Sequence, residues 1–462
     1  MKIPDFAKCA IEDCQAYALF KFDPCTTCGV EEEIAEILEI IDFDKVTEEV
    51  ESLRPPHRCI KIDKFESPYH VNQFNGSFNF HLVIDFDVGT KWVMRIRWKQ
   101  TRLQPDEAIE MCMRSEIATL KALFDGGARV TRSYERPRHS TVSSELMYFY
   151  QEFVKGFPTH CVFGPMTPKP MTSTCMKSYA AWMISLEKIT FNKAGSLRLT
   201  DRGEVVFGSH IERDRTALIH PPYYLGPFNT AKERWLSTIA WKMRSILDKR
   251  EVKPSEELLC YLSMLEMKDL VSGCEELEKG PRYIKHYDLH GRHDKDTGEL
   301  NALLDWEWAS LTCKAEAFIP PDCFRVEGRN PCSSDLGETE RLLVEAYVEL
   351  GRPDLIQLIR GGRKYHWIHI IVLRTHFSVG ALNAARGAFL GLSDDWTGYP
   401  ETVEEWRDMM LNRYREDDGV KELLSRQKMK YPPKPTRSAV KKRSSKKSND
   451  KRASVEVVEA GL

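Results

Sequence analysis

The stretch from Tyr283 to Ser310 constrains this 462-residue chain more than any other part of the sequence. It contains two acidic residues, Asp288 in a polar segment with a nearby glycine, and Asp305 directly after the apolar run 302–304. An apolar run of this kind predicts a short buried strand, which would place Asp305 at its end, facing a cleft. A hairpin-like return would bring Asp288 to the same place. One acid of such a pair can orient a substrate hydroxyl while the other holds Mg²⁺ on nucleotide phosphates.

The two halves of this stretch resemble the aminoglycoside phosphotransferase and choline-kinase-like family, in particular its fungal subgroup. The family reads H-x-D-L/F-H-x-x-N, then a short hairpin and I-I-D-W-E, and segments 286–290 and 305–307 match these patterns. The resemblance implies an α+β, bilobal protein-kinase-like fold, with a small antiparallel-sheet N-lobe and a larger helical C-lobe. It implies transfer of the ATP γ-phosphoryl group to a hydroxyl of a small molecule, with Asp288 as the catalytic residue and Asp305 as a ligand of Mg²⁺.

The sequence departs from the family pattern just after Asp288. The family has a metal-binding asparagine at the position of His293, and the interval from Asp288 to Asp305 is 17 residues where about nineteen or twenty is usual. Either Asp294 or His293 replaces the lost ligand, or the site is degraded. Because a hard cation prefers oxygen, Asp294 is the better substitute. The alternative is a pseudokinase, a nucleotide-binding or interaction module without the reaction.

A strand-like pattern begins at His57, after the helix-breaking Arg54-Pro55-Pro56. Within it, a hairpin turn could fold over a nucleotide, with backbone N–H groups facing phosphate. The turn residues are Asn75, Gly76 and Ser77. A glycine in a turn is weak support by itself, and an ordinary hairpin turn is the other interpretation.

Segments 75–79 and 92–95 resemble the nucleotide loop and following strand of the fungal subgroup. The resemblance implies that Arg95 contacts phosphate where kinases have a lysine, and a guanidinium can hold phosphate oxygens with two parallel hydrogen bonds. A surface strand arginine is the alternative. In the predicted helix 105–123, Glu116 matches the acid that pairs with this cation.

The apolar segment 146–156 resembles the hinge between the two lobes of the family. The resemblance implies that backbone groups from Gln151 to Phe153, including those of Glu152, face an adenine. The alternative is that the segment is only a strand of the core. One segment can serve as both. Segments 191–197 and 222–229 also resemble the fungal subgroup, which widens the similarity to roughly residues 57 to 376.

The two ends of the chain lie outside the kinase-like pattern. Cys9, Cys14, Cys25 and Cys28 have spacings that resemble a zinc site, but the first two are better explained by an amphipathic helix. The region 31–41 has isoleucines at helical spacing and predicts a docking face. Residues 426–452 contain twelve Lys or Arg and one acid, so this segment has a net charge of +11 and the rest of the chain has a net charge of −13.

These observations divide the chain into four parts: a helical extension 1–56, the N-lobe 57–155, the helical C-lobe 156–425 with the catalytic loop, and a disordered basic tail 426–462. The 13 cysteines and the lack of a secretory leader or a long apolar run indicate a reducing, cytoplasmic location without membrane contact. The tail lysines leave nuclear import open, and this tail is the one part of the chain that could bind nucleic acid. The alternative is a solubilising tail, because no aromatic residues that could stack on bases follow Tyr431. The sequence does not fix an oligomeric state.

Overall fold

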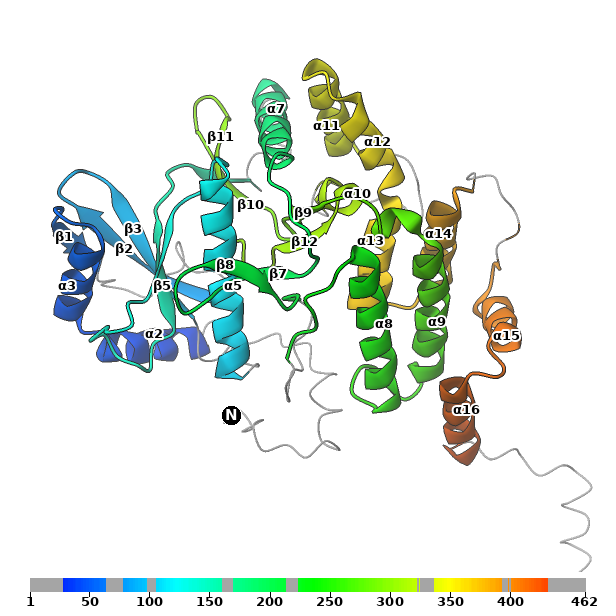
Figure 1. Cartoon of the computed structure of the whole chain (residues 1–462). Helices are drawn as coiled ribbons and strands as arrows, with labels where there is room; N and C mark the ends of the chain where they lie inside the picture. The colour runs from blue at the N-terminus through cyan, green and yellow to red at the C-terminus, as the bar shows by residue number, and fades with distance from the viewer. Residues whose placement is uncertain are drawn as a thin grey trace, which may run out of the picture.

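The computed structural model describes residues 28–63, 78–97, 105–159, 169–212, 223–321, 324, 336–392, 398 and 400–430. These residues form two lobes, which lie at the left and right of Figure 1. The smaller lobe is built on an antiparallel sheet of strand order β1–β2–β3–β5–β4, and the larger lobe is mainly helical. The structure therefore confirms the predicted α+β class and the order of the lobes.

The sheet of the small lobe divides its side chains between two faces. Its strands are β1 (Cys59–Ile62), β2 (Asn79–Phe86), β3 (Lys91–Arg97), β4 (Ser133–Glu135) and β5 (Tyr148–Glu152). Because successive strand residues point to opposite faces, Met94 and Ile96 of β3 lie in one apolar cluster, while Arg95 and Arg97 point away from it. Arg95 contacts helix α5 (Asp106–Asp125) on that other face.

Two helices from the amino-terminal extension cover the apolar face of this sheet. Helices α2 (Cys28–Ile40) and α3 (Phe43–Leu53) pack there, and Ile34, Ile37 and Ile41 are buried as their spacing predicts. Glu49 of α3 is buried and accepts hydrogen bonds from the hydroxyls of Tyr148 at 2.6 Å and Tyr150 at 2.8 Å. The extension and the sheet therefore share one core, whereas Cys9, Cys14 and Cys25 lie outside the described residues.

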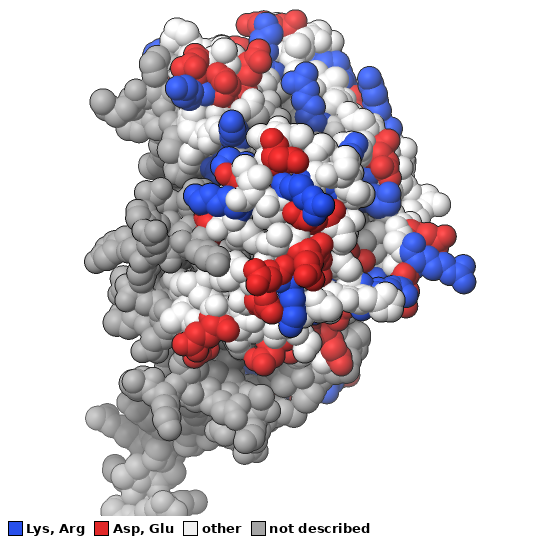
Figure 2. Space-filling model, turned by 90° about the vertical axis from the view of Figure 1, so that its left-hand side faces the viewer, with Lys and Arg blue, Asp and Glu red and all other residues white. Residues whose placement is uncertain are grey.

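The outer surface at this end of the molecule is strongly charged. Figure 2 shows acidic side chains gathered near the middle of the visible face, with Lys and Arg interspersed around them. The exposed acids of α2, of α3 and of the link between them include Glu36, Glu39, Asp42, Asp44 and Glu48. These charges lie on the solvent side of helices whose other side is apolar, which is the usual pattern for amphipathic helices on a sheet.

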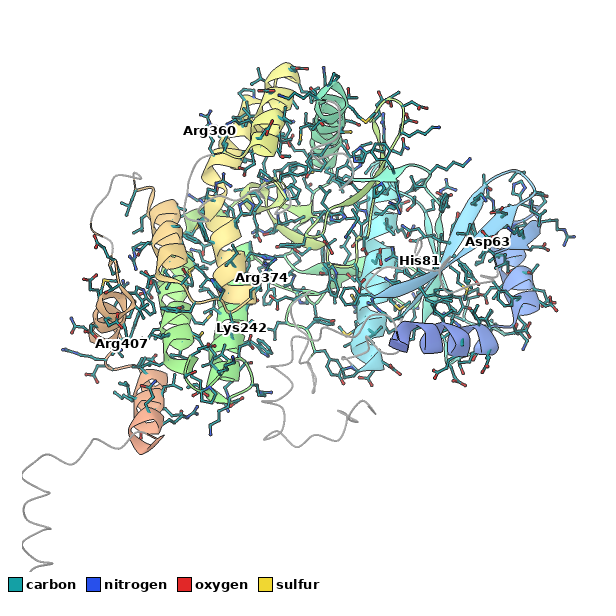
Figure 3. The ribbon with its side chains drawn as sticks, turned by 180° about the vertical axis from the view of Figure 1, so that it is seen from behind. Asp63, His81, Lys242, Arg360, Arg374 and Arg407 are labelled. Atoms are coloured by element: carbon teal, nitrogen blue, oxygen red, sulfur yellow. The ribbon has the colours of Figure 1, made fainter. Side chains whose placement is uncertain are left out.

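The larger lobe packs its helices around short strand pairs. Figure 3 shows it from behind, with Lys242 on α8 and Arg407 on α15. The helical elements are α7 (Lys169–Leu186), α8 (Ala231–Leu247), α9 (Glu257–Gly273), η2 (Glu275–Leu277), α10 (Lys314–Ala317), α11 (Glu338–Glu349), α12 (Pro353–Gly361), α13 (Arg363–Ile368), η4 (His369–Leu373), α14 (Val379–Leu390), α15 (Val403–Arg413) and α16 (Asp418–Lys430). The strands are β6 (Phe157–Pro158), β7 (Ser196–Leu199), β8 (Val205–Gly208), β9 (Arg282–Lys285), β10 (His290–His293), β11 (Leu300–Leu304) and β12 (Ser310–Cys313). None of the helices within the described ranges is both long and apolar enough to cross a membrane.

Two antiparallel strand pairs place the acids that dominate the sequence. Strand β9 pairs with β12, and β10 pairs with β11 so that His290 lies opposite Leu304. Asp288 therefore lies in the link from β9 to β10, and Asp305 in the link from β11 to β12. The strand predicted from the apolar run is the end of β11, and the return that joins both acids is present.

Candidate active site

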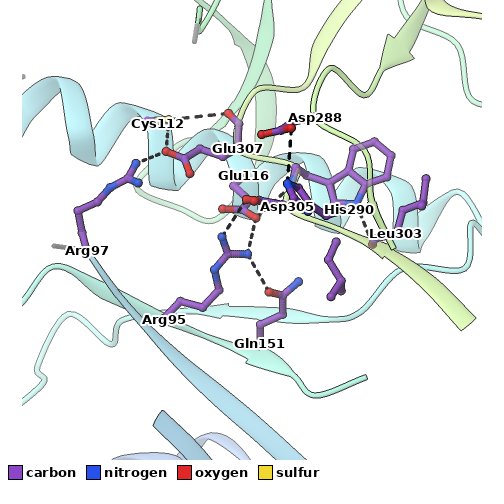
Figure 4. A network of polar contacts seen from close by, with 12 residues as sticks. Arg95, Arg97, Cys112, Glu116, Gln151, Asp288, His290, Leu303, Asp305 and Glu307 are labelled. Carbon is purple, nitrogen blue, oxygen red and sulfur yellow. Dashed lines mark hydrogen bonds and ion pairs between the residues drawn. The ribbon is translucent and has the colours of Figure 1, made fainter. Parts of the chain in front are cut away.

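Asp288 and Asp305 meet in the structure and are joined by His290. One possible ligand atom from each of the three residues lies within 4.8 Å of the others. The His290 Nε2 atom is 3.5 Å from Asp288 Oδ1, and Figure 4 shows these side chains with Asp305 close by. Two carboxylates and an imidazole within this distance can bind one divalent cation. The sequence predicted the two acids, but not His290.

Arg95 connects this cluster to the small lobe. Its guanidinium donates to Glu116 Oε1 at 2.7 Å, to Gln151 Oε1 at 3.1 Å and to Asp305 Oδ1 at 3.1 Å. Only 5% of Arg95 is exposed, so it is not a surface strand arginine. The expected pairing of the strand cation with the acid of α5 is present, and Arg95 also reaches the acid after β11 (Figure 4).

Charge and burial act in opposite directions on the two acids that contact Arg95. Burial raises the pKa of Glu116 to about 7, although Arg95 acts against this shift. For Asp305, burial also acts to raise the pKa, but Arg95 and then His290 outweigh it and hold the pKa below its usual value. Asp305 is therefore an anion at neutral pH. It adopts a left-handed backbone conformation, with φ at 63°, which is uncommon outside glycine and clusters at functional sites.

A second buried ion pair joins the same two lobes, and the sequence did not reveal it. Arg97 Nη2 donates to Glu307, which belongs to the D-W-E segment, and both side chains are almost fully buried. The Cys112 thiol of α5 donates to the same carboxylate at 3.4 Å, and burial raises the pKa of this thiol well above its usual value. The available signal was the strand period, because Arg95 and Arg97 are two residues apart and share one face.

A buried polar network holds the segment around Asp288 in place. Arg234 of α8 donates to both carboxylate oxygens of Glu316, at 2.6 and 2.8 Å, and to the Tyr287 hydroxyl at 3.0 Å. The Tyr287 hydroxyl in turn donates to Glu316 at 2.8 Å. Arg234 and Glu316 are each only 1% exposed. Because Tyr287 directly precedes Asp288, this network fixes the position of the backbone at Asp288, the candidate catalytic residue.

His286 fixes the other side of the same segment. Its Nε2 atom donates to the backbone oxygen of Leu304 at 2.8 Å, since a carbonyl can only accept, and its ring contacts the Trp306 ring edge to face. Burial lowers the pKa of His286 to about 4. The imidazole is therefore neutral at pH 7 and links the residue before Asp305 to the segment that contains Asp288.

We expect His286 to make the fold sensitive to mild acid. Its pKa is lower in the folded chain than the unfolded value of about 6.5, so the unfolded chain binds more protons between pH 6.5 and 4, and stability falls as the pH falls through this window. Between pH 7 and pH 5 the loss from this residue is about 2 kcal/mol. Urea unfolding at both pH values, for the natural chain and for His286→Gln, measures it. An equal pH dependence in both proteins would contradict the assignment.

The two substitutes considered for the missing asparagine are not brought to the cluster. His293 is buried within β10, where its ring nitrogens lie 3.2 Å from Thr159 Oγ1 and 3.2 Å from the Gly298 oxygen. Asp294 caps the far end of the β10–β11 hairpin, where its Oδ1 accepts the backbone N–H groups of Asp296 and Thr297. Four residues of strand beyond His290 correspond to about 13 Å. This geometry does not support the expectation that Asp294 is a metal ligand beside Asp305.

The predicted hinge segment joins the two lobes. Within it, Glu152 is hydrogen-bonded to the backbone of Arg132. Its carboxylate accepts the Arg132 N–H at 3.1 Å, and its own N–H donates to the Arg132 oxygen at 3.0 Å. Gly156 lies so close to β10 that an added Cβ would be 2.4 Å from the His293 oxygen, so only glycine fits there. The role of Glu152 at a nucleotide remains a prediction, and Asn75, Gly76 and Ser77 lie outside the described residues.

Neither family models nor curated proteins give a match to this chain. Solved structures give low similarities. A gentamicin complex of APH(2″)-IIa has a TM-score of 0.42 and 11% identity over 79% of this chain and 97% of the other. ADP-bound APH(2″)-Ib, an aminoglycoside phosphotransferase, has a TM-score of 0.42 and 11% identity over 75% of this chain and 99% of the other. A putative fructosamine-3-kinase from Thermobifida fusca has a TM-score of 0.39 and 12% identity over 78% of this chain and 100% of the other. The resemblance to the fungal subgroup remains a prediction.

Proposed function

We propose that this protein is a phosphotransferase that moves the γ-phosphoryl group of ATP to a hydroxyl of a small molecule. The proposal depends on one observation: Arg95 contacts Glu116 and Asp305 together, directly beside Asp288. A strand cation, a helix acid that pairs with it, a cation-binding acid and a base are the parts that phosphoryl transfer in kinase-like enzymes requires. Here they come from both lobes and converge on one place.

Each residue of this cluster has a separate role. Asp288 orients the hydroxyl of the acceptor and takes its proton, because its carboxylate is partly exposed beside the cluster and can reach a bound molecule. Arg95 contacts the phosphates through a guanidinium that suits their geometry. Glu116 holds Arg95 in this position, and Gln151 supports it from β5.

The donor atoms of the cluster suit a divalent cation. Asp305 is anionic and, with 32% of its side chain exposed, can reach a ligand. One possible ligand atom from each of Asp288 and His290 lies within 4.8 Å of its carboxylate. A cation bound here would neutralise charge on the nucleotide phosphates. The family implies Mg²⁺ for this role, and Asp305 offers the oxygen that Mg²⁺ prefers. The imidazole of His290 fits Mg²⁺ less well.

We expect ATP and ADP to bind only together with a divalent cation, and Asp305→Ala to lose this dependence. The reason is that Asp305 is the charged ligand that connects the cation to the protein. Calorimetric titration of the full-length chain with ATP, with and without the cation, measures both effects. Asp294→Ala separates the two candidate acids, because the geometry predicts unchanged binding for it and the sequence pattern predicts a loss. Binding that is indifferent to metal and to Asp305 would contradict the proposal.

The alternative is a pseudokinase that uses the same fold as a nucleotide-binding or interaction module. It is favoured by the shortened segment after Asp288, because residues 289–294 contain neither Asn nor Gln that could offer an amide oxygen in place of the asparagine. This alternative predicts that nucleotide binds weakly or without metal. It also predicts that Asp288→Asn changes no measurable reaction.

A further inference from the structure

We propose that this protein has a second binding site, which takes a small zwitterion with an apolar body, the chemical class of free apolar amino acids. The site is a cavity of about 460 Å³ between α5 and the pair of strands β7 and β8 (Figure 1). Cavities that bind small molecules usually measure about 300–1,000 Å³. The inference does not depend on the proposed function, because none of Arg95, Glu116, Asp288 and Asp305 lines this cavity.

One side of α5 forms a wall of the cavity. The helix residues in this wall follow spacings of three, four, seven and eight residues from the first of them, which is the pattern of a single helix face. They are Glu107, Glu110, Met111, Arg114 and Ser115. Glu116 contacts Arg95 from a different side of the helix, because successive helix residues point about 100° apart.

The acids of this wall lack a cation, although an arginine lies beside them. Arg114 Nε is 3.0 Å from Glu135 Oε1, and Arg114 Nη2 is 3.5 Å from Asp201 Oδ1, so its charge is already neutralised. Glu107 and Glu110 are exposed and form no ion pair with any residue that the structure describes. Because they are three residues apart on one helix, their carboxylates are neighbours. Together they suit an ammonium group.

The opposite wall carries a positive charge that is also uncompensated. Arg198 of β7 lines the cavity, is exposed and has no acidic partner in the described ranges. Its methylene chain lies over Gly208 of β8, where an added Cβ would be 3.1 Å from Arg198 Cδ. A guanidinium can hold a carboxylate with two parallel hydrogen bonds. A ligand with both charges can therefore bridge the two walls, with its ammonium at Glu110 and its carboxylate at Arg198.

An apolar surface lies between these charges. Met111, Ile211, Tyr223 and Tyr224 all line the cavity and belong to one apolar cluster. The Tyr223 hydroxyl is hydrogen-bonded to the Glu107 carboxylate, which leaves its ring as part of the wall. Aromatic rings and a methionine thioether pack well against an aromatic or large aliphatic side chain. This surface explains the apolar body in the proposed ligand class.

Ser115 gives independent support for a ligand. It lines the cavity and is only 1% exposed, and its Oγ atom is buried without a hydrogen-bond partner among the described protein groups. The large majority of buried side-chain polar atoms are hydrogen-bonded. A polar group of a bound zwitterion can supply the partner that the chain does not.

The first test titrates the full-length protein with L-phenylalanine, L-leucine and L-methionine, one at a time, by calorimetry. We expect at least one of them to bind. The amide of that amino acid lacks the carboxylate and its N-acetyl derivative lacks the ammonium, so each should bind at least about tenfold more weakly, the effect of losing a hydrogen bond to a charged group. Glycine lacks the apolar body and should also bind at least about tenfold more weakly.

Two variants assign the charges of the ligand to the walls. Glu110→Gln and Arg198→Gln should each weaken binding of the amino acid about tenfold. Glu110→Gln should not weaken the N-acetyl derivative further, and Arg198→Gln should not weaken the amide further, because the paired group is already absent. The matched controls are Glu204→Gln and Arg202→Gln. Both residues are exposed between β7 and β8 and do not line the cavity, so affinity should be unchanged.

The outcomes separate this inference from the proposed function. No binding of any of the three amino acids at about 10 mM, or an affinity that neither Glu110→Gln nor Arg198→Gln changes, would overturn the site. An amide that binds as tightly as the amino acid would overturn the zwitterion. Asp305→Ala should lose ATP and keep the amino acid, whereas loss of the amino acid in this variant alone would place the ligand at the candidate active site and overturn the inference. A natural chain that binds the amino acid but not ATP would contradict the phosphotransferase only.

Discussion

Asp288→Asn is expected to slow phosphoryl transfer by roughly 10²- to 10⁴-fold, the range for loss of a positioned base. The amide has nearly the same shape as the carboxylate, so it can still lie beside His290, but it cannot take a proton from the acceptor hydroxyl. Nucleotide affinity should change little, because the proposed mechanism assigns the ion to Asp305 and the phosphates to Arg95. Formation of ADP from ATP, with water or an added alcohol as acceptor, measures the rate.

The control for this variant is Asp296→Asn. Asp296 is exposed at the tip of the β10–β11 hairpin, where its backbone N–H donates to Asp294, and its own carboxylate belongs to neither candidate metal cluster within the described residues. The same chemical change should therefore leave both rate and affinity unaltered. An Asp288→Asn protein that retains the full rate would remove Asp288 from the reaction and favour the pseudokinase. A loss of affinity equal to the loss of rate would instead assign Asp288 to the metal.

Residues next to a strong local pattern were predictable from the sequence. The apolar run before Asp305 predicted the end of β11, and the structure places that acid at its end. The helical period around Glu116 predicted α5, and the pairing of Glu116 with Arg95 follows from facing elements of the small lobe. In each case the residue's position in its own strand or helix nearly decides which way its side chain points.

Residues whose partner depends on register or chain length were not predictable. His290 joins the cluster because β10 pairs with β11 in one register, and a shift of one residue would turn its ring to the other face. Arg97 and Glu307 are 210 residues apart and meet only once both lobes are folded. Asp294 looked like a metal ligand by chemistry, but a turn closed by its own carboxylate takes it away from the site.

The amino-terminal extension shows the same limit. Its apolar period predicted a docking face, but no pattern in the chain identifies the surface that this face covers. Glu49 accepts hydrogen bonds from two tyrosines of β5, the strand that leads into the hinge. The extension therefore supports β5. This strand contains Gln151, which accepts a hydrogen bond from Arg95. A segment outside the kinase-like pattern thus contributes to the position of a site residue.

Breaking the Arg234–Glu316 ion pair is expected to give the largest loss of stability. Arg234→Met leaves the Glu316 carboxylate buried without its cation, which costs about 3–5 kcal/mol for pairs of this kind. Arg234 and Glu316 are each 1% exposed, so water cannot replace the lost partner. The midpoint of urea unfolding, at constant slope, measures the loss. Arg413→Met is the control, because the Arg413–Asp269 pair is exposed and should contribute no more than about 1 kcal/mol.

The double variant Arg234→Met/Glu316→Leu separates charge from packing. It removes both charges, so its loss of stability should be smaller than the sum of the single losses, with a coupling of up to about 3 kcal/mol. It should not restore full stability, because Tyr287 and Trp235 lose the carboxylate that accepts their hydrogen bonds. If the network only stabilises the lobe, the double variant keeps its reaction rate. If it also positions Asp288 through Tyr287, the rate falls while nucleotide affinity is retained. Additive single losses would show that the two side chains do not act as a pair.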